Sequence, residues 1–228
     1  MLRHVLVGLY LLCTLPASAQ LDSVPYRAGF PFNKGVYLTF EQFKANAPLP
    51  YHKIERKDIV SMYNGESVRF RRKFFRYRDA NDSLRKVKVL DTWGYSNGIN
   101  VYVNPYSAAE TKPINSRHHQ FCRLQVTGAA GVFSQFYLSS HMGSNRSSAM
   151  PRQQLSESSN EWLVSLKTGQ CYRYNVDNLL ILLQDDPTLL TEFEQMIRTT
   201  RRPRDQIMVY VRKYNKRHPL HFPAAVNK

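Results

Sequence analysis

The sequence predicts an α+β fold, with an antiparallel β-sheet body over residues 35–174 and a helical C-terminal segment over residues 175–228. Two observations support this division. Around Val68 and Phe70, apolar residues alternate with Arg69 and Arg71, which is the period of a half-buried strand. After Asn175, apolar residues recur instead at the three- and four-residue spacing of an amphipathic helix.

Turn-forming residues separate the predicted strands and indicate hairpins. The segment 79–83, with the sequence DANDS, separates the strand that begins near Ser67 from a return strand carrying Lys86 and Lys88. Asn97 and Gly98 form the strongest hairpin signal in the chain. Further strands are expected around 120–126, 132–139, 161–166 and 170–174, and the Ser-rich stretch 140–159 is expected to be a loop.

The C-terminal segment contains three helix-start signals. Asn175 precedes a leucine-rich stripe and is a favoured N-cap residue. Asp186 followed by Pro187 combines a favoured N-cap with the residue preferred at the first helical position. Asp205 is expected to cap a last helix, and Pro219 is expected to end it.

The first nineteen residues have the three-part layout of a secretory signal peptide. Arg3 supplies the positive start, an apolar run follows, and Ala17-Ser-Ala19 supplies the small residues of a cleavage site. The apolar run is shorter than the roughly 20 residues that span a bilayer. We therefore expect export, cleavage after Ala19, an irregular segment over 20–34, and a location in the periplasm, at the cell surface or outside the cell.

The chain is strongly basic, with 32 Lys and Arg against 17 Asp and Glu and a net charge of +15. Removal of residues 1–19 takes away one arginine and no acid, which leaves 15 − 1 = +14. Such a field favours anionic partners, namely polysaccharide, lipid headgroups or nucleic acid, although it also serves solubility.

Two cysteines, Cys122 and Cys171, remain after the predicted cleavage. Both lie in predicted strands, and an oxidising compartment would permit a disulfide between them. Two buried, unbonded thiols are the alternative, because the sequence does not give the Cα separation that a disulfide requires.

Several stretches resemble a group of small secreted Bacteroidetes proteins of unknown function. They are GVYLTFEQF at 35–43, DTWGYSNGINVYV at 91–103, the run 166–190 and the tail YNKRHP at 214–219. The resemblance implies an exported protein and carries over no catalytic or binding residue.

A basic stretch at 69–78, RFRRKFFRYR, is the first candidate binding site. Cations interleaved with aromatic rings can hold phosphates while stacking on bases or sugars. If the strands on either side of the 79–83 turn pair, we expect Arg69, Arg71, Lys86 and Lys88 to share one anion-binding face. The alternative is an ordinary half-buried strand whose basic side lies in solvent.

Three aromatic residues around the Asn97–Gly98 turn are a second candidate. Trp93, Tyr95 and Tyr102 could form a platform for a sugar ring, or they could pack in the core as most large aromatics do.

The sequence contains no catalytic or cofactor motif. Gly-x-Ser-x-Gly, His-Glu-x-x-His and a phosphate-binding Gly loop are all absent. No metal or cofactor site is predicted either, because His118, His119 and Cys122 have no second pair of ligand residues at the usual spacing to complete a metal site. These observations favour a non-enzymatic binding or surface-associated protein with an anionic partner. A hydrolase of envelope polymers with dispersed catalytic residues, and a structural or assembly subunit, are the alternatives.

Overall fold

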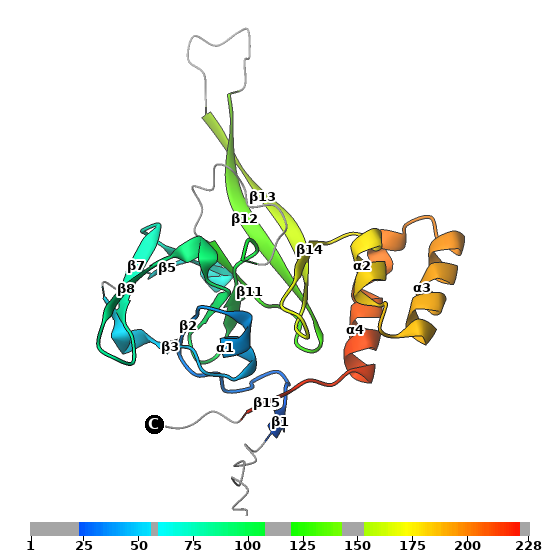
Figure 1. Cartoon of the computed structure of the whole chain (residues 1–228). Helices are drawn as coiled ribbons and strands as arrows, with labels where there is room; N and C mark the ends of the chain where they lie inside the picture. The colour runs from blue at the N-terminus through cyan, green and yellow to red at the C-terminus, as the bar shows by residue number, and fades with distance from the viewer. Residues whose placement is uncertain (1–22, 56–58, 108–119, 143–152, 224–228) are drawn as a thin grey trace, which may run out of the picture.

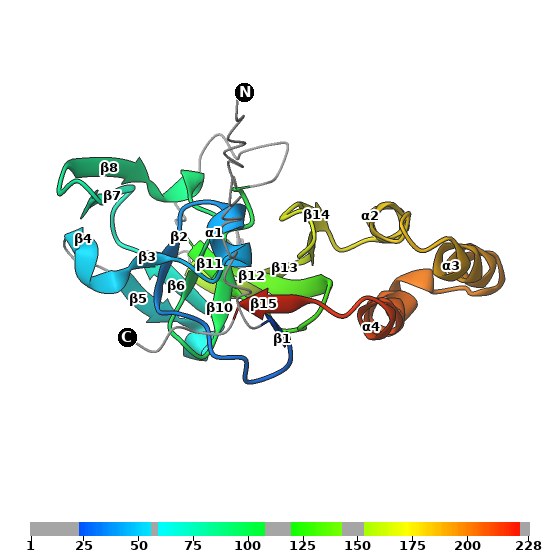
Figure 2. The same cartoon turned by 60° about the horizontal axis from the view of Figure 1, so that its bottom comes forward.

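The computed structural model describes residues 23–55, 59–107, 120–142 and 153–223. Antiparallel strands form the body, and a helical segment over 176–217 follows them, so the predicted α+β class is confirmed. The β7–β8 hairpin and the C-terminal helices lie at opposite ends of the molecule in both orientations of Figures 1 and 2.

The body is built around a seven-stranded antiparallel sheet. In spatial order its strands are β3 (Leu49–Pro50), β2 (Gly35–Tyr37), β9 (Gly94–Ser96), β10 (Val101–Val103), β11 (Gln120–Arg123), β6 (Ser67–Phe70) and β5 (Ile59–Met62). The predicted Asn97–Gly98 turn connects β9 to β10, and the positive φ of 95° at Gly98 explains the glycine there.

Each face of this sheet covers a separate hydrophobic core. Val101 and Val103 point into one core and Tyr102 into the other, as the period-two alternation of a strand requires. The first is the aromatic core, which includes Tyr37, Phe43, Trp93, Cys122, Phe133, Trp162, Cys171 and Phe222. The second is the outer core, which includes Val36, Ile54, Val68, Phe70, Phe75, Tyr102 and Phe121.

A three-stranded sheet covers the outer core. It consists of β4 (Ile54–Glu55), β7 (Phe74–Arg78) and β8 (Leu84–Lys88), in that order. Ile54 and Phe75 are buried in the outer core, and Tyr77 and Val87 pack against it. One face of the sheet is therefore apolar and the other lies outward, as in a typical antiparallel layer.

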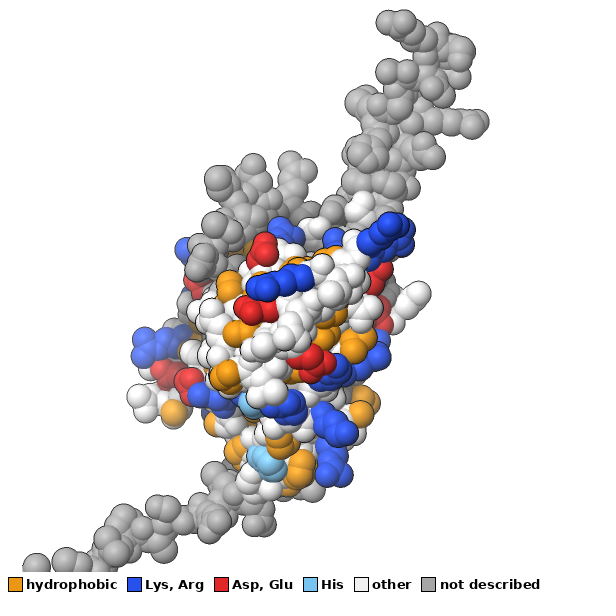
Figure 3. Space-filling view, turned by 90° about the vertical axis from the view of Figure 1, so that its right-hand side faces the viewer, with side chains coloured by type: hydrophobic (Ala, Val, Ile, Leu, Met, Phe, Trp, Pro, Cys, Tyr) orange, Lys and Arg blue, Asp and Glu red, His pale blue; other side chains and the backbone are white. Residues whose placement is uncertain are grey.

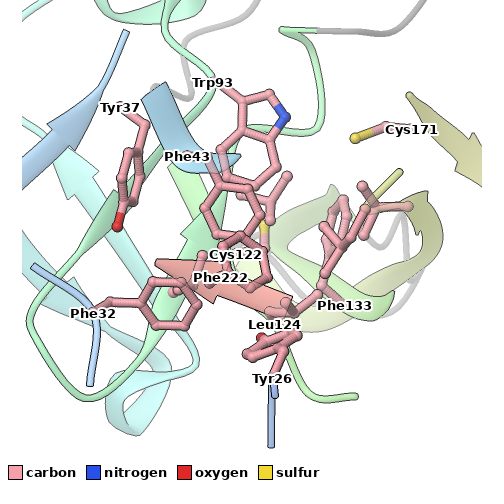
Figure 4. Close-up of a cluster of buried hydrophobic side chains, with 14 of the residues drawn as sticks. Tyr26, Phe32, Tyr37, Phe43, Trp93, Cys122, Leu124, Phe133, Cys171 and Phe222 are labelled. Carbon is pink, nitrogen blue, oxygen red and sulfur yellow. The ribbon is translucent and has the colours of Figure 1, made fainter. Parts of the chain in front are cut away.

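The aromatic core joins segments from both ends of the chain (Figure 4). Helix α1 (Phe40–Lys44) contributes Phe43, whose ring lies 4.2 Å from that of Trp93 and 4.9 Å from that of Phe222. Phe222 belongs to β15 (His221–Pro223), which pairs with β1 (Ser23–Pro25). The segment 20–34, which we expected to be irregular, thus contains a strand.

A long hairpin separates the aromatic core from the helices. It consists of β12 (Ala130–Met142) and β13 (Gln153–Ser165), with β14 (Cys171–Arg173) paired to the second strand. Phe133 and Trp162 lie opposite each other and face the aromatic core, whereas Val132 and Leu163 face the helices. Residues 140–142 and 153–159 were expected to be loop but are strand, because they continue this ladder.

The C-terminal helices are α2 (Val176–Leu182), α3 (Pro187–Thr199) and α4 (Ile207–Arg217). The side chains of Asn175 and Asp186 accept hydrogen bonds from the backbone N–H of Asn178 and Leu189, so both predicted N-caps are confirmed. Asp205 was expected to cap the last helix, but it lies within a 3-10 turn and Gln206 occupies that position. No helix among the described residues is long and apolar enough to cross a membrane.

Candidate functional site

The predicted 79–83 turn connects β7 to β8 and determines their register. The Asp79 carboxylate accepts hydrogen bonds from the backbone N–H of Asn81 and Ser83, at 2.9 and 3.0 Å, which holds the turn closed. Arg78 then lies opposite Leu84, and Arg76 lies opposite Lys86. Directly opposed residues of an antiparallel pair point to the same face, so this register decides which cations meet.

One face of the hairpin is exposed along its whole length. We call it the hairpin outer face, and it consists of Phe74, Arg76, Arg78, Leu84, Lys86 and Lys88. The intervening residues Phe75, Tyr77 and Val87 point inward to the outer core. The predicted strand alternation therefore holds in part within the hairpin: four of the six outer positions are basic, Phe74 and Leu84 are apolar, and Arg85 stands opposite Tyr77 on the inner side.

Charge on the hairpin is partly neutralised at its tip. Arg78 forms an ion pair with Asp82 at 3.2 Å, and Arg85 with Asp79 at 2.8 Å. The hydrogen bond from Arg85, reinforced by the bonds from the turn backbone, holds the pKa of Asp79 below its ordinary value.

Away from the tip the cations lack acidic partners. Within the described parts of the chain, Arg76, Lys86 and Lys88 form no ion pair. Arg76 and Lys86 stand directly opposite each other, so two like charges share one rung of the ladder. Glu55 of β4 continues that rung beyond Arg76, and its single negative charge leaves the row positive.

A groove of about 460 Å³ opens beside these residues at the start of β7. Arg72, Lys73, Arg76 and Lys86 contribute four positive charges to it, against the one negative charge of Glu55. Its apolar wall is formed by the aromatic rings of three residues, Phe70, Phe74 and Phe75. A groove with this lining can accept an anionic group, because several cations converge on it beside an aromatic wall.

The structure corrects part of the predicted anion-binding face. Lys86 and Lys88 lie together on the hairpin outer face, as expected. Arg69 instead belongs to β6 of the central sheet, where it lies opposite Gln120 and Val60, and its Nε is buried. Arg71 lies in a bend between β6 and β7. The expected long strand is thus two strands in two sheets, because the chain bends at residues 71–73 to cross from one layer to the next.

The cations that lie beside Lys86 in the groove are Arg72, Lys73 and Arg76, whereas we had predicted Arg69 and Arg71. The pairing of Arg76 with Lys86 follows from counting outward from the 79–83 turn, so a signal for it was present in the sequence. Arg72 and Lys73 had no such signal, because they lie in the bend where strand alternation does not apply.

The aromatic platform is not exposed. Trp93 and Tyr102 each have only 3% of their surface accessible, and they lie in different cores. Tyr95 is half-buried and packs against Tyr102, with ring centroids 5.8 Å apart. These residues therefore have the alternative role of core packing, since a buried ring offers no face to a sugar.

Cys122 and Cys171 are both buried and unbonded. They come from β11 and β14, which belong to different sheets, and both contribute to the aromatic core (Figure 4). Burial raises the pKa of both thiols, the Cys171 thiol to about 12, so neither is an activated nucleophile.

A second cluster of charged residues lies between α3 and α4. Both carboxylate oxygens of Asp186 accept hydrogen bonds, Oδ1 from the Leu189 backbone and Arg217 and Oδ2 from His218 at 3.0 Å. Burial would raise the pKa of Asp186, but these bonds and the Arg217 charge lower it instead. The carboxylate thus caps α3 and holds α4 against it, which is a structural role.

Beside it, Asp185 forms an ion pair with Lys167 at 2.6 Å and accepts a hydrogen bond from the Tyr214 hydroxyl at 2.8 Å. The face that carries the C-terminal helices displays acidic and basic side chains interspersed (Figure 3). Several charges on that part of the molecule are therefore paired with opposite charges.

The described residues contain no group of three or more potential metal ligands. His118 and His119, for which no metal site was predicted, lie outside the described residues, as do residues 1–19. No family model, no curated protein and no solved structure matches the chain.

Proposed function

We propose that this chain is an exported, non-enzymatic binding protein that attaches to an anionic partner through the hairpin outer face and the adjoining groove. The observation that carries the proposal is the row formed by Arg76 and Lys86, two opposed cations that form no ion pair with any described residue. Opposed like charges cost free energy in a sheet, and an anionic ligand would turn that cost into attraction.

The positions of the other charged residues also favour the hairpin outer face and its groove as the binding surface. Lys73 and Arg76 reach the groove from one strand, and Lys86 reaches it from the other. At the other end of the molecule three acids, Asp185, Asp186 and Glu192, are paired with Lys167, Arg217 and Lys213 respectively. A long-range field from a basic chain acts most strongly where its cations remain unpaired and close together.

The test compares two variants with equal loss of charge. The chain is produced with export, its intact mass is measured to show whether it begins at Gln20, and its binding to heparin, a soluble sulfated polysaccharide, is measured by calorimetry. Variant R76Q/K86Q/K88Q should bind at least about tenfold more weakly and with a shallower salt dependence, because three close electrostatic contacts are lost.

The matched control is R198Q/R212Q/K216Q, which removes three exposed cations from α3 and α4. It should bind heparin as the unmodified chain does. Equal weakening in both variants would show that net charge alone drives binding and would reject the hairpin as a site. An intact mass that retains residues 1–19 would reject the cleavage.

A further inference from the structure

The hairpin outer face carries exposed apolar side chains among its cations. Phe74 is 38% exposed and lies opposite Lys88, and Leu84 is 49% exposed and lies opposite Arg78. The solvent face of an antiparallel sheet is ordinarily polar. Two large apolar residues among the six positions of this face therefore require an explanation.

The position of Phe74 connects the apolar and the basic features. The Lys86 ammonium lies 4.4 Å from the centroid of the Phe74 ring, and both residues line the groove. The charged end of Lys86 thus lies over the Phe74 ring in a cation–π contact, which places a cation and an apolar group side by side on this face. At a membrane interface the same two neighbours can rearrange so that the lysine stem lies on apolar surface and the charge meets the headgroups.

These features distinguish between anionic partners. A sulfated sugar or a nucleic-acid backbone would use the cations, but it would leave the Leu84 side chain in water. An anionic lipid surface uses both, because apolar side chains enter the boundary between headgroups and acyl chains while basic residues attract the negative leaflet. On the hairpin outer face the Arg76–Lys86 pair lies between Phe74 and Leu84, and each apolar residue stands directly opposite a cation.

We propose that the partner is an anionic phospholipid surface, on which the protein lies peripherally with the hairpin outer face against the headgroups. Phe74 and Leu84 enter the interface, and the groove lined by Arg72, Lys73, Arg76 and Lys86 receives a headgroup phosphate. This inference rests on the proposed function and names the chemistry of its partner.

The test measures co-sedimentation of the chain from Gln20, which contains every described residue, with two kinds of vesicle. One is phosphatidylcholine mixed with phosphatidylglycerol, and the other is phosphatidylcholine alone. Binding is expected only to the mixed vesicles. Variant R76Q/K86Q/K88Q should bind them about 100-fold more weakly, since each cation at such a surface contributes about 1 kcal/mol.

The decisive variant is F74S/L84S, which keeps every charge. It should bind the mixed vesicles at least about tenfold more weakly, because apolar burial is lost, and this loss should clearly exceed any loss of heparin affinity, which depends mainly on the cations. The matched control is I181S/V209S, which replaces two apolar residues of α2 and α4 with 45% and 41% exposure and should bind vesicles normally. Circular dichroism of each variant shows that it is folded.

A second readout follows the interface itself. The two native tryptophans, Trp93 and Trp162, are 3% and 4% exposed, so a third tryptophan introduced by F74W reports on its own surroundings. Its emission should shift to shorter wavelength with mixed vesicles, and much further than with heparin, because only the vesicle offers an apolar environment.

The outcomes separate this inference from the proposed function. Binding to heparin without binding to mixed vesicles would overturn the lipid surface and leave an anionic partner in place. Equal vesicle binding by the unmodified chain and F74S/L84S would also overturn it. Binding to neither probe would overturn both proposals.

Discussion

The β7–β8 hairpin and the C-terminal helices both contain many charged residues, but the two regions differ in how those charges are paired. On the helices, Glu192 forms an ion pair with Lys213, and Asp186 forms one with Arg217. On the hairpin, Arg76 stands opposite Lys86, and neither forms an ion pair with another described residue. At one end of the molecule ion pairs hold two helices together, and at the other end two opposed cations remain available.

The difference teaches that net charge and a binding surface are separate properties. A total of +15 describes the whole chain and already counts its acids, so it does not say which cations stand beside an acid. That depends on which strands and helices bring opposite charges together. The comparison also predicts opposite mutational behaviour, in which charge removal costs stability at the helices and costs binding at the hairpin.

The largest stability effect is expected for D186A. Asp186 is 4% exposed, and its carboxylate caps α3 and accepts hydrogen bonds from Arg217 and His218. The substitution removes the N-cap of α3 and leaves the Arg217 guanidinium without its carboxylate partner. Urea denaturation should show a free energy of unfolding about 2–3 kcal/mol lower.

Asp177 provides the control, because it lies in the first turn of α2 and is exposed. D177A should lower the free energy of unfolding by at most about 0.5 kcal/mol. If D186A and D177A have equal effects, the contacts of Asp186 do not hold α3 and α4 together.

A smaller loss is expected on acidification, because protonation leaves the Asp186 side chain in place. The pKa values of Asp186, Asp185 and Glu192 are all lowered in the folded protein by their hydrogen-bond and ion-pair partners. A lowered folded pKa stabilises the protein above the unfolded value, and this contribution is lost as pH falls through the folded value. The free energy of unfolding should therefore decrease below about pH 4.

The variant D186A supplies the comparison for this titration. It lacks one of the three carboxylates, so its free energy of unfolding should fall less steeply between neutral and acidic pH. Denaturation curves collected across that range for both proteins give the two slopes. Identical slopes would contradict the lowered pKa of Asp186 in the folded state.

The smallest stability effect is expected for R76Q/K86Q/K88Q. Arg76, Lys86 and Lys88 are exposed and form no ion pair with another described residue. Their replacement by glutamine therefore removes repulsion between like charges and breaks no ion pair among the described residues. The free energy of unfolding should stay within about 0.5 kcal/mol of its original value, with any change upward at low salt. A clear loss of stability would show that these cations support the fold and would end the contrast between the two regions.

Local sequence signals predicted much of both regions. Asn175 and Asp186 were predicted as N-caps, and the structure shows both accepting a backbone hydrogen bond. The turns at 79–83 and at Asn97–Gly98 were also located correctly. These features involve residues within a few positions of one another, so the nearby sequence is enough to specify them.

The residues of the candidate site were predicted less well from these local sequence signals. Arg69 and Arg71 were grouped with Lys86 because an alternating pattern seemed to continue through the bend at 71–73. Alternation reports the face of a single strand and contains nothing about which sheet that strand joins. Arg72 and Lys73 reach the groove only because the chain crosses there from the central sheet to the outer one.

Composition, alternation and capping residues were sufficient for the α+β class, the hairpin turns and the helix starts, because each depends on short-range backbone and side-chain geometry. The tertiary structure alone decided that Trp93 and Tyr102 are buried and that Arg69 belongs to β6. It also decided that four cations meet beside Phe74. Those outcomes depend on sheet partners and layer packing between distant segments, which strand periodicity does not encode.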